Sequence, residues 1–348
     1  MHVVKVGGSI LKDESDLVLI KNKIKDCNKC IIVTSALRNV TNNLIEAITT
    51  KNTIIIDTIF DMHEKILKNY YDEFVYDKLS EYREDLFHLL LGHINEEKRD
   101  LILSYGEKMA TLVLYAFFKK NGFDVDYIIK PLIVTDSNFG DASYIFRETE
   151  ANFKELALNH DITIVPGFTG ITLDNKVTTL GRGGSDYTAM IFGRFFNADV
   201  RLVTDVPGVM TSDPKIFKDS KTLTEISITE ALKMSYFRVK NFNYKTFTPV
   251  LDADIKITVE SLYSGEKTLI TRNKINSVKC IALAGFAEKN MLVFIGHGMS
   301  DSFISENIIN NIGKNHLYHQ DDLSLSVLMD EDMVKNKRCF EEAPSWIG

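Results

Sequence analysis

An arginine, two consecutive glycines and a Ser-Asp pair occur together in the stretch TTLGRGGSDYTAM, residues 178–190. Gly183 and Gly184 allow backbone N–H groups to approach a ligand that a side chain would exclude. A helix that begins at Ser185 would direct the positive end of its dipole to the same place. Arg182 adds a planar, permanently charged group that suits a carboxylate or a phosphate. This stretch therefore predicts an anion-binding site.

A second glycine pair lies near the start of the chain, in HVVKVGGSIL, residues 2–11. The β-branched residues before it predict a buried strand, and the helical spacing of Leu17, Ile20 and Ile24 predicts a helix after it. Strand, glycine turn and helix together are typical of a phosphate-binding unit. Lys5 lies inside the strand, where a lysine is costly to bury unless an anion pairs with it. A lysine whose ammonium reaches solvent is the alternative. The P-loop and GxGxxG patterns are absent here.

Three further polar clusters are candidates for the same site, at residues 34–42 (TSALRNVTN), 104–107 (SYGE) and 204–215 (TDVPGVMTSDPK). Each has a structural alternative. Thr41 suits a helix cap, Glu107 suits a solvated helix face, and Asp205 and Asp213 suit turns that contain proline and glycine. Taken together, the glycines, cations and carboxylates at strand ends favour a polyphosphate with its metal, facing a small charged substrate.

Phosphoryl transfer to an anionic acceptor is the chemistry that this set favours. A kinase mainly aligns donor and acceptor and neutralises charge. No histidine lies in the clusters, so a serine-type triad is not expected there. A carboxylate acceptor, with an ordinary pKa of about 4, needs no general base. Lys5, Arg182, Mg²⁺ and oriented N–H groups would overcome its repulsion from a triphosphate.

The elements that must position these residues alternate between strand and helix through about residue 200. Strand patterns occur at residues 2–6, 30–35, 125–135, 161–165 and 199–204, and helical patterns at 41–50, 53–120, 145–158 and 185–196. This alternation predicts an α/β fold with a mainly parallel sheet sandwiched by helices. Ligands of such sheets bind beyond the carboxyl ends of the strands, so we expect the glycine turns to converge on one edge.

The pattern changes after about residue 275. Strand patterns follow at residues 278–285, 291–295 and 323–329, and helical patterns at 301–312 and 331–341. These elements predict a small α+β module.

Composition excludes some classes of protein. The chain has 348 residues, enough for two or three domains, and its net charge of −7 argues against a general nucleic-acid binder. We see no uninterrupted apolar run long enough for a membrane span and no signal peptide, so we expect a cytoplasmic enzyme. Cys27 and Cys30 form a single C-x-x-C, which is a poor zinc site without a second pair. We favour a structural or incidental role for it and expect no metal held by the protein alone.

The motifs KVGGS, SALRNVTNNL, SYGE, GFTG with TTLGRGGSDYTA, and TDVPGVMTSDPK occur in this order over residues 2–270. In this combination the chain resembles the aspartate kinases of the amino acid kinase superfamily. Related acetylglutamate, glutamate, uridylate and carbamate kinases share the glycine motifs but not the whole set. The resemblance implies an amino acid kinase domain over residues 1–272, with ATP and Mg²⁺ as cofactors. It implies phosphorylation of the side-chain carboxylate of L-aspartate to 4-phospho-L-aspartate, the first step towards lysine, threonine and methionine.

The resemblance also implies roles for individual residues. Lys5, Gly8 and Asp186 would be catalytic, and Lys5 would stabilise the transferred phosphoryl group. Glu107 would bind the aspartate ammonium and Arg182 its α-carboxylate. Further substrate contacts would come from Ser9, Thr41 and Ser185. The nucleotide would be bound by Lys5, Gly7, Gly8, Thr204, Asp205, Met210, Asp213, Lys215 and Lys240.

Some positions depart from the aspartate kinase pattern. The family's KFGGTS is KVGGSI here, so Ser9 keeps a hydroxyl while Ile10 replaces the following serine. The family's GAKVLHP corresponds to residues 238–244, which retain Lys240 but not the His-Pro. Residues 275–345 resemble one ACT domain, a regulatory or dimerisation unit, where most aspartate kinases have two. A homodimer or higher homo-oligomer is expected, and inhibition by lysine or threonine is left open.

Two alternatives remain. One is a related kinase with a different acceptor, because the tyrosine- and phenylalanine-rich region 53–100 could reshape the acceptor pocket. The other is a non-catalytic regulatory subunit on the same fold. Such a subunit would be expected to lose charged catalytic residues, and this chain retains Lys5, Glu107, Arg182 and Asp186.

Overall fold

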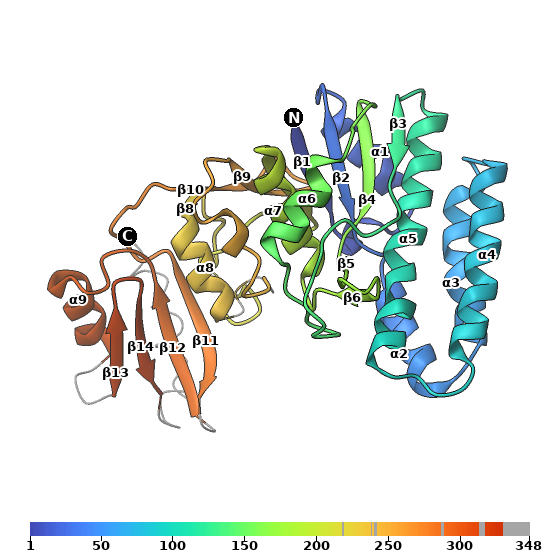
Figure 1. Ribbon diagram of the computed structural model, residues 1–348. Coiled ribbons are helices and arrows are strands. Elements are labelled where there is room, and N and C mark those ends of the chain that lie inside the picture. The colour runs from blue at the N-terminus through green and yellow to red at the C-terminus, as the bar shows by residue number, and fades with distance from the viewer. Residues whose placement is uncertain (218, 238, 240–241, 287–288, 313–316, 330–348) are drawn as a thin grey trace. The chain divides into compact units, whose positions relative to one another are not determined.

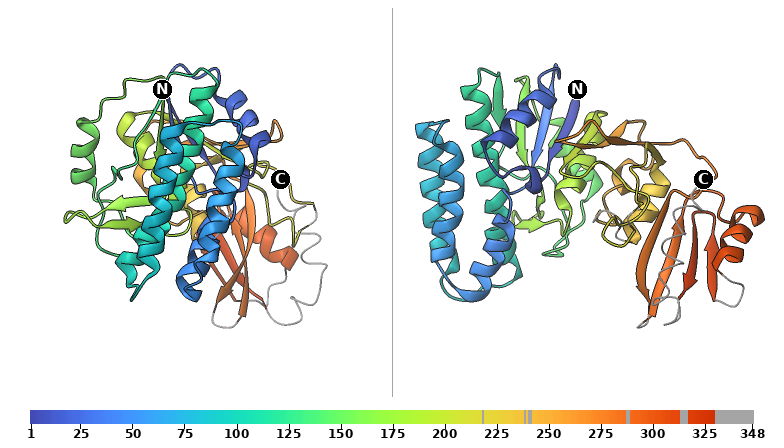
Figure 2. Two further views of the ribbon diagram at one scale, coloured as in Figure 1. Left: turned by 90° about the vertical axis from the view of Figure 1, so that its right-hand side faces the viewer. Right: turned by 180° about the vertical axis from the view of Figure 1, so that it is seen from behind.

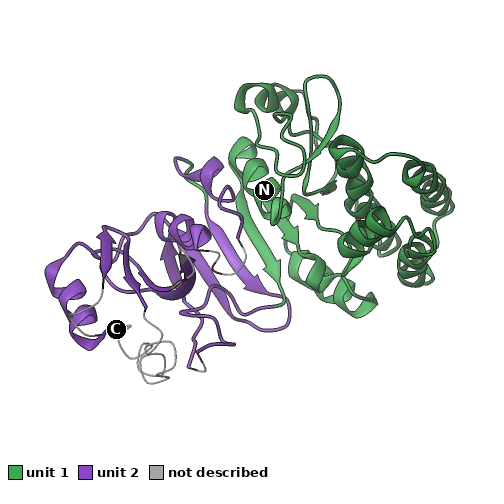
Figure 3. Cartoon of the chain, turned by 90° about the horizontal axis from the view of Figure 1, so that it is seen from below, with its two compact units in different colours: residues 1–205, 253–255 green, residues 206–252, 256–348 purple. Residues whose placement is uncertain are grey.

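The computed structural model describes residues 1–217, 219–237, 239, 242–286, 289–312 and 317–329. The chain forms two compact units (Figure 3). The first contains residues 1–205 and 253–255, and the second contains residues 206–252 and 256–348. The domain boundary expected between residues 272 and 275 stays a prediction.

A parallel sheet forms the centre of the first unit. Its strands are β1 (His2–Val6), β2 (Cys30–Thr34), β3 (Val125–Tyr127), β4 (Ile162–Pro166) and β7 (Asp199–Thr204). They lie in the order β3-β4-β2-β1-β7, and each neighbouring pair is parallel. Every residue of β2 and of β4 is buried, as expected for strands covered on both faces. The carboxyl ends of these strands therefore meet at one edge, and the predicted α/β class is confirmed.

Helices cover both faces of this sheet. They are α1 (Glu14–Ile24), α2 (Val40–Thr50), α3 (Ile54–Leu67), α4 (Glu73–Leu90), α5 (Glu96–Lys120), α6 (Phe146–Lys154) and α7 (Gly184–Phe196). Figure 1 shows α7 in front of the strands, and Figure 2 shows α1 on the opposite face. Helix α5 packs between strands β3 and β4 and the neighbouring pair α3 and α4. The expectation of a mostly helical region over residues 53–120 is confirmed.

Helix α5 has an unusual combination of length and composition. Among the described residues, α5 is the one helix whose length and apolar composition would by themselves suit a membrane span. Its window of highest hydropathy is 83% buried within the protein. The same composition is therefore explained by its position as a core helix, with charges at Glu107 and Lys108 breaking any continuous apolar run.

A short hairpin corrects one expectation about the glycine turns. Strands β5 (Thr169–Ile171) and β6 (Val177–Thr179) pair antiparallel in a separate two-stranded sheet. The turn at residues 181–184 follows β6, so it does not follow a strand of the parallel sheet as expected. The strand pattern at 125–135 was also too long, since β3 ends at Tyr127 and Pro131 lies within the remainder.

The second unit contains two groups of strands. Strand β10 (Lys267–Thr271) pairs antiparallel with β9 (Ile257–Ser261) and parallel with β8 (Glu225–Ser227), which leads into α8 (Ile228–Tyr236). A short 3₁₀ turn, η3, covers Thr248–Val250. The other group is an antiparallel sheet in the order β11-β12-β14-β13. Its members are β11 (Cys280–Phe286), β12 (Lys289–Ile295), β13 (Tyr318–Asp321) and β14 (Ser324–Leu328).

Helix α9 (Ser302–Ile312) covers this antiparallel sheet through a core that includes Leu292, Phe294, Ile308 and Leu325. Strand β13 was not predicted because its residues are polar and mostly exposed and lack apolar alternation. The helix expected at residues 331–341 lies outside the described residues. The antiparallel sheet and α9 are compatible with the expected ACT-like module.

Candidate active site

A pocket of about 460 Å³ lies in the first unit, where the turns after β1 and β2 meet α5 and the first turn of α7. All eight residues that the sequence suggested for catalysis or substrate binding line it: Lys5, Gly8, Ser9, Thr41, Glu107, Arg182, Ser185 and Asp186. These residues come from four segments that are far apart in the sequence. The fold therefore assembles one site from them.

Lys5 and Asp186 form an ion pair at the centre of this site. The Nζ of Lys5 lies 2.8 Å from Oδ1 of Asp186, and the two side chains are only 13% and 17% exposed. Strand β1 holds Lys5, while Asp186 lies in the first turn of α7, where the helix dipole favours a negative charge. An ammonium with little access to solvent is thus presented to the pocket in a fixed orientation.

Two glycines are required by the local geometry. A Cβ on Gly8 would lie 2.6 Å from the carbonyl oxygen of Ala36, so the turn after β1 approaches the turn after β2 more closely than any side chain allows. Gly183 caps α7 with φ of 77°, a left-handed conformation that glycine adopts without strain. Both glycines shape the wall of the pocket.

Glu107 is a buried carboxyl group in the pocket wall. It is 3% exposed, and its Oε1 accepts a hydrogen bond of 3.1 Å from the Ala36 backbone N–H. Its Oε2 has no hydrogen-bond partner among the described residues. Burial raises the pKa of Glu107 to about 8, although the Ala36 hydrogen bond opposes the shift. The alternative of a solvated helix face is therefore wrong.

The structure brings together only some of the residues that the sequence suggested for nucleotide binding. Gly7 donates its N–H to the Val203 carbonyl at 3.3 Å. Asp205 Oδ1 accepts from the Ser9 hydroxyl at 2.9 Å and from the Thr204 hydroxyl at 3.2 Å. Gly7, Thr204 and Asp205 thus adjoin the turn after β1 without lining the pocket. Met210, Asp213 and Lys215 belong to the second unit, and Lys240 lies outside the described residues.

The sequence and the fold are similar to those of known proteins. The model of the amino acid kinase family matches residues 1–261. The chain belongs to the amino acid kinase family. It is 30% identical to an aspartokinase of Chlamydia pneumoniae over 271 residues, which are 76% of this chain and 61% of that protein. It is 33% identical to aspartokinase 1 of Bacillus subtilis over 202 residues, 56% of this chain and 50% of that protein.

The chain therefore spans about half to three fifths of the length of these relatives. Its fold is shared with the crystal structure of Escherichia coli aspartokinase III in complex with aspartate and ADP. The TM-score is 0.77 at 23% identity, and the similarity covers 98% of this chain and 84% of the other. The pocket lies at the carboxyl edge of the parallel sheet, which is where ligands of such α/β sheets bind.

Two residues near the site were missed by the sequence analysis. Phe168 lines the pocket with φ of 64°, a backbone conformation that no sequence pattern of a phenylalanine predicts. Asp100 is fully buried in α5, and its carboxylate accepts hydrogen bonds from the Gly140 N–H, the Thr179 N–H and the Thr179 hydroxyl. Burial raises the pKa of Asp100 while these hydrogen bonds lower it. The sequence signal that could have indicated Asp100 was an acidic residue on the buried face of an apolar helix.

Asp100→Ala is expected to weaken substrate binding through the turn at residues 181–186. Asp100 holds β6, which leads into that turn, and it lies two helical turns before Glu107 on the same helix. Removing its carboxylate takes the acceptor from two buried donors of Thr179 and from the half-buried N–H of Gly140, which we expect to lower the free energy of unfolding by about 1–3 kcal/mol. Urea unfolding and acceptor titrations would measure both effects. Asp61→Ala, at an exposed position of α3, is the matched control, and unchanged values for Asp100→Ala would contradict this role.

Proposed function

We propose that this protein is an aspartate kinase that transfers the γ-phosphoryl group of ATP to the side-chain carboxylate of L-aspartate. The product is 4-phospho-L-aspartate, which leads towards lysine, threonine and methionine. The observation that carries the proposal is the buried Oε2 of Glu107, which has no hydrogen-bond partner among the described residues and lies in the same pocket as the Lys5–Asp186 pair. A buried carboxyl oxygen without a partner is costly unless a ligand cation completes it. An amino acid supplies that cation together with an anionic acceptor.

In this proposal each end of the acceptor has its own contact. Glu107 binds the ammonium group, and Arg182, which is exposed at the pocket rim, binds the α-carboxylate. The hydroxyl groups of Ser9, Thr41 and Ser185 add hydrogen bonds along the pocket wall. The side-chain carboxylate is then directed to Lys5. The two relatives of this chain are named aspartokinases, which supports the same acceptor.

The transfer itself needs little covalent help from the protein. A carboxylate oxygen of aspartate attacks the γ-phosphorus, the bond to the β–γ bridging oxygen breaks, and ADP leaves. The acceptor is already ionised, so no residue has to remove a proton. Lys5 and the first turn of α7 stabilise the charge that develops on the transferred group, while Asp186 keeps the ammonium of Lys5 in position.

The nucleotide is proposed to bind beside the same turn, with Gly7, Gly8, Thr204 and Asp205 contributed by the first unit. The resemblance to the aspartate kinases adds Met210, Asp213, Lys215 and Lys240 to the residues proposed for the nucleotide. Among the described residues, no group of three or more His, Cys, Asp and Glu side chains could hold a metal ion. We propose that Mg²⁺ arrives on the nucleotide phosphates, because Mg²⁺ usually has only one or two protein carboxylates as ligands. When bound, Mg²⁺ would neutralise phosphate charge.

The acceptor can be identified with the purified full chain. ADP release would be measured with ATP, Mg²⁺ and one of L-aspartate, L-glutamate, N-acetyl-L-aspartate, N-acetyl-L-glutamate, homoserine or UMP. Hydroxylamine in the assay traps an acyl phosphate as a hydroxamate, so it separates a carboxyl acceptor from a hydroxyl or phosphate acceptor. We expect turnover and hydroxamate with L-aspartate and neither with N-acetyl-L-aspartate, which lacks the ammonium. Turnover with another acceptor and none with aspartate would refute the proposal.

Arg182→Lys is expected to raise the KM for aspartate by about ten- to a hundredfold, with a much smaller change in the KM for ATP. Lysine keeps the charge but cannot form the paired hydrogen bonds that a guanidinium makes with a carboxylate. Steady-state titration of each substrate at saturating levels of the other would measure both constants. Equal changes in the two KM values would contradict the assignment to the α-carboxylate.

The antiparallel sheet β11–β14 with α9 is proposed to act as a single ACT-like unit in regulation or dimer formation. We further propose a homodimer or higher homo-oligomer. Sedimentation of the full chain, with and without lysine and threonine, would test both points.

A further inference from the structure

A pair of cysteines lies at the amino-terminal edge of the parallel sheet, away from the pocket at the carboxyl edge. Cys27 lies in the connection between α1 and β2, and Cys30 is the first residue of β2. The Cys27 N–H donates to the Ile24 carbonyl at 2.9 Å, and the chain bends at residues 28 and 29. Cys27 is half-buried, whereas Cys30 is 2% exposed. The chain therefore folds back between one accessible sulfur and one shielded sulfur.

The surroundings of the two sulfurs differ. Nη1 of Arg201 on β7 lies 3.7 Å from the Cys27 sulfur. Nη1 of Arg201 is held by the Lys23 carbonyl at 3.0 Å. The neighbouring Cys30 thiol, with the charges of Arg201 and His2, lowers the pKa of Cys27 to about 6. The neighbouring Cys27 sulfur and burial raise the pKa of Cys30. One sulfur is thus a thiolate near neutral pH, while the other retains its proton.

We propose that Cys27 and Cys30 form a reversible thiol–disulfide couple, in which Cys27 reacts with a hydroperoxide or a low-molecular-weight disulfide and Cys30 resolves the product. With a hydroperoxide, the Cys27 sulfur attacks the terminal oxygen, the O–O bond breaks, and the alcohol or water leaves after protonation. The Cys30 sulfur then attacks the resulting sulfenic acid, the S–O bond breaks, and water leaves with the Cys30 proton. The dithiol loses two electrons and the hydroperoxide gains them.

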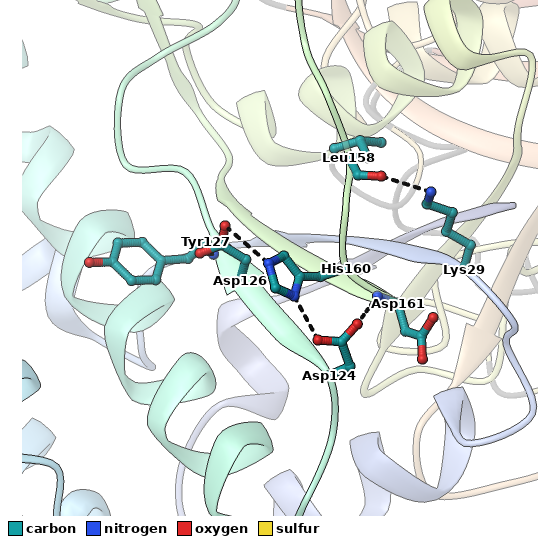
Figure 4. A network of polar contacts seen from close by, with 7 residues as sticks. All are labelled: Lys29, Asp124, Asp126, Tyr127, Leu158, His160 and Asp161. Atoms are coloured by element: carbon teal, nitrogen blue, oxygen red, sulfur yellow. Dashed lines mark hydrogen bonds and ion pairs between the residues drawn. The ribbon is translucent and has the colours of Figure 1, made fainter.

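The segment beside Cys30 is well anchored. The Cys30 N–H donates to the Asp161 carbonyl at 2.8 Å, and Nζ of Lys29 donates to the Leu158 carbonyl at 2.8 Å. Figure 4 shows His160 between Asp124 and Asp126, with ring-nitrogen to carboxylate distances of 2.6 and 3.9 Å. These contacts fix residues 158–161 and so hold Cys30 in the sheet. Movement of the α1–β2 connection would bring Cys27 to Cys30, without disturbing the strand that leads to the pocket.

Alkylation at different pH values tests the thiolate. The protein would carry Cys339→Ser, because Cys339 lies outside the described residues, and each cysteine would be followed by peptide mass spectrometry after iodoacetamide treatment. We expect the Cys27 rate to rise with a midpoint near pH 6. At pH 6 about half of Cys27 would be thiolate, against about 0.3% of an ordinary thiol. Allowing for weaker nucleophilicity, its rate should exceed that of an unperturbed thiol by about tenfold.

Two variants and an internal control sharpen this experiment. Cys280 is fully buried, and burial raises its pKa to about 12, so it should stay unmodified until the protein unfolds. Arg201→Gln should shift the Cys27 midpoint upwards, whereas Arg201→Lys should keep most of the effect because it retains the charge. A Cys27 midpoint at or above 8 in the parent protein would overturn the proposal.

Oxidation tests the couple itself. Hydrogen peroxide or oxidised glutathione should join Cys27 to Cys30 in one peptide, with a loss of two hydrogens that dithiothreitol reverses. In Cys30→Ser, a sulfenic acid or a glutathione adduct should instead accumulate on Cys27. Kinase activity should change by less than about twofold on oxidation, since the pocket is at the other edge. Adducts or higher oxides on Cys27 in the parent, with Cys30 still alkylated after unfolding, would refute the pairing whether or not the acceptor is aspartate.

Discussion

Lys5→Met is expected to lower kcat by about 10²–10³-fold, with smaller changes in both KM values. Methionine preserves the length and apolar stem of the side chain but removes the ammonium that faces the pocket. Loss of one preorganised charge that stabilises a transition state typically costs this much. Turnover at saturating ATP and aspartate would measure the effect. Lys21→Met, which removes a hydrogen bond between α1 and Asn121 on the protein surface, is the matched control.

The Asp186 carboxylate loses its partner in Lys5→Met, so a second variant is needed. Asp186→Asn alone keeps the ammonium but removes the group that positions it, and we expect a loss of activity smaller than that of Lys5→Met. The double variant should be no worse than Lys5→Met, because both changes act on one group. Unchanged turnover of folded Lys5→Met would show that the lysine takes no part in the reaction.

Glu107→Gln is expected to raise the KM for aspartate by about a hundredfold and to abolish a release of protons on binding. With a pKa of about 8, the carboxyl group of Glu107 is about 90% protonated at pH 7 in the free protein. Binding of an ammonium favours the carboxylate, so each aspartate bound at pH 7 should release about 0.9 proton. Calorimetric titrations in two buffers of different ionisation enthalpy would count these protons. The wild-type KM for aspartate should fall as pH rises towards 8, and no proton release in the wild type would contradict the ammonium contact.

Glu107→Gln is also expected to change the way in which the stability of the protein depends on pH. The pKa of Glu107 is raised in the native state, so between about pH 5 and pH 8 the native protein binds a proton that the unfolded chain does not. The contribution of this proton is fully present below the unfolded pKa and is lost as pH rises through the folded pKa. Stability of the wild type relative to Glu107→Gln should therefore decrease from pH 5 to pH 8. Urea midpoints of both proteins across this range would measure the difference.

Much of the first unit could be predicted from the sequence because its signals are local. A β-branched run ended by glycine marked β1, and a β-branched run followed by a polar turn marked β2. The pattern through residue 120 ended at Asn121, the observed cap of α5. Parallel alternation then implied that the strand ends share one edge. The shared edge predicts that Lys5 and the turns after β1 and β2 form one site, whereas the role of Glu107 followed from the resemblance to the aspartate kinases.

The remaining features depend on contacts that a sequence pattern does not encode. Glutamate at position 107 reads as a surface residue, and only the packing of Gly106 against Ala36 and Val40 shows that this side of α5 is buried. The same holds for Cys27, whose Arg201 partner comes from a strand more than 170 residues away. Strand β13 lacked a signal because an edge strand with polar residues gains its stability from pairing with β14 alone.

Helix α5 fixes the spacing and the direction of two buried acidic side chains, Asp100 and Glu107. Asp100 and Glu107 are seven residues apart, so they face the same way about 10.5 Å from each other along the axis. One residue inserted between them would rotate Glu107 by about 100° and take its carboxyl group away from Ala36. Insertions or deletions in the turn before α5 should therefore be tolerated. Insertions or deletions between Asp100 and Glu107 should abolish activity. Single-residue insertions at each position of residues 91–108 would measure this difference.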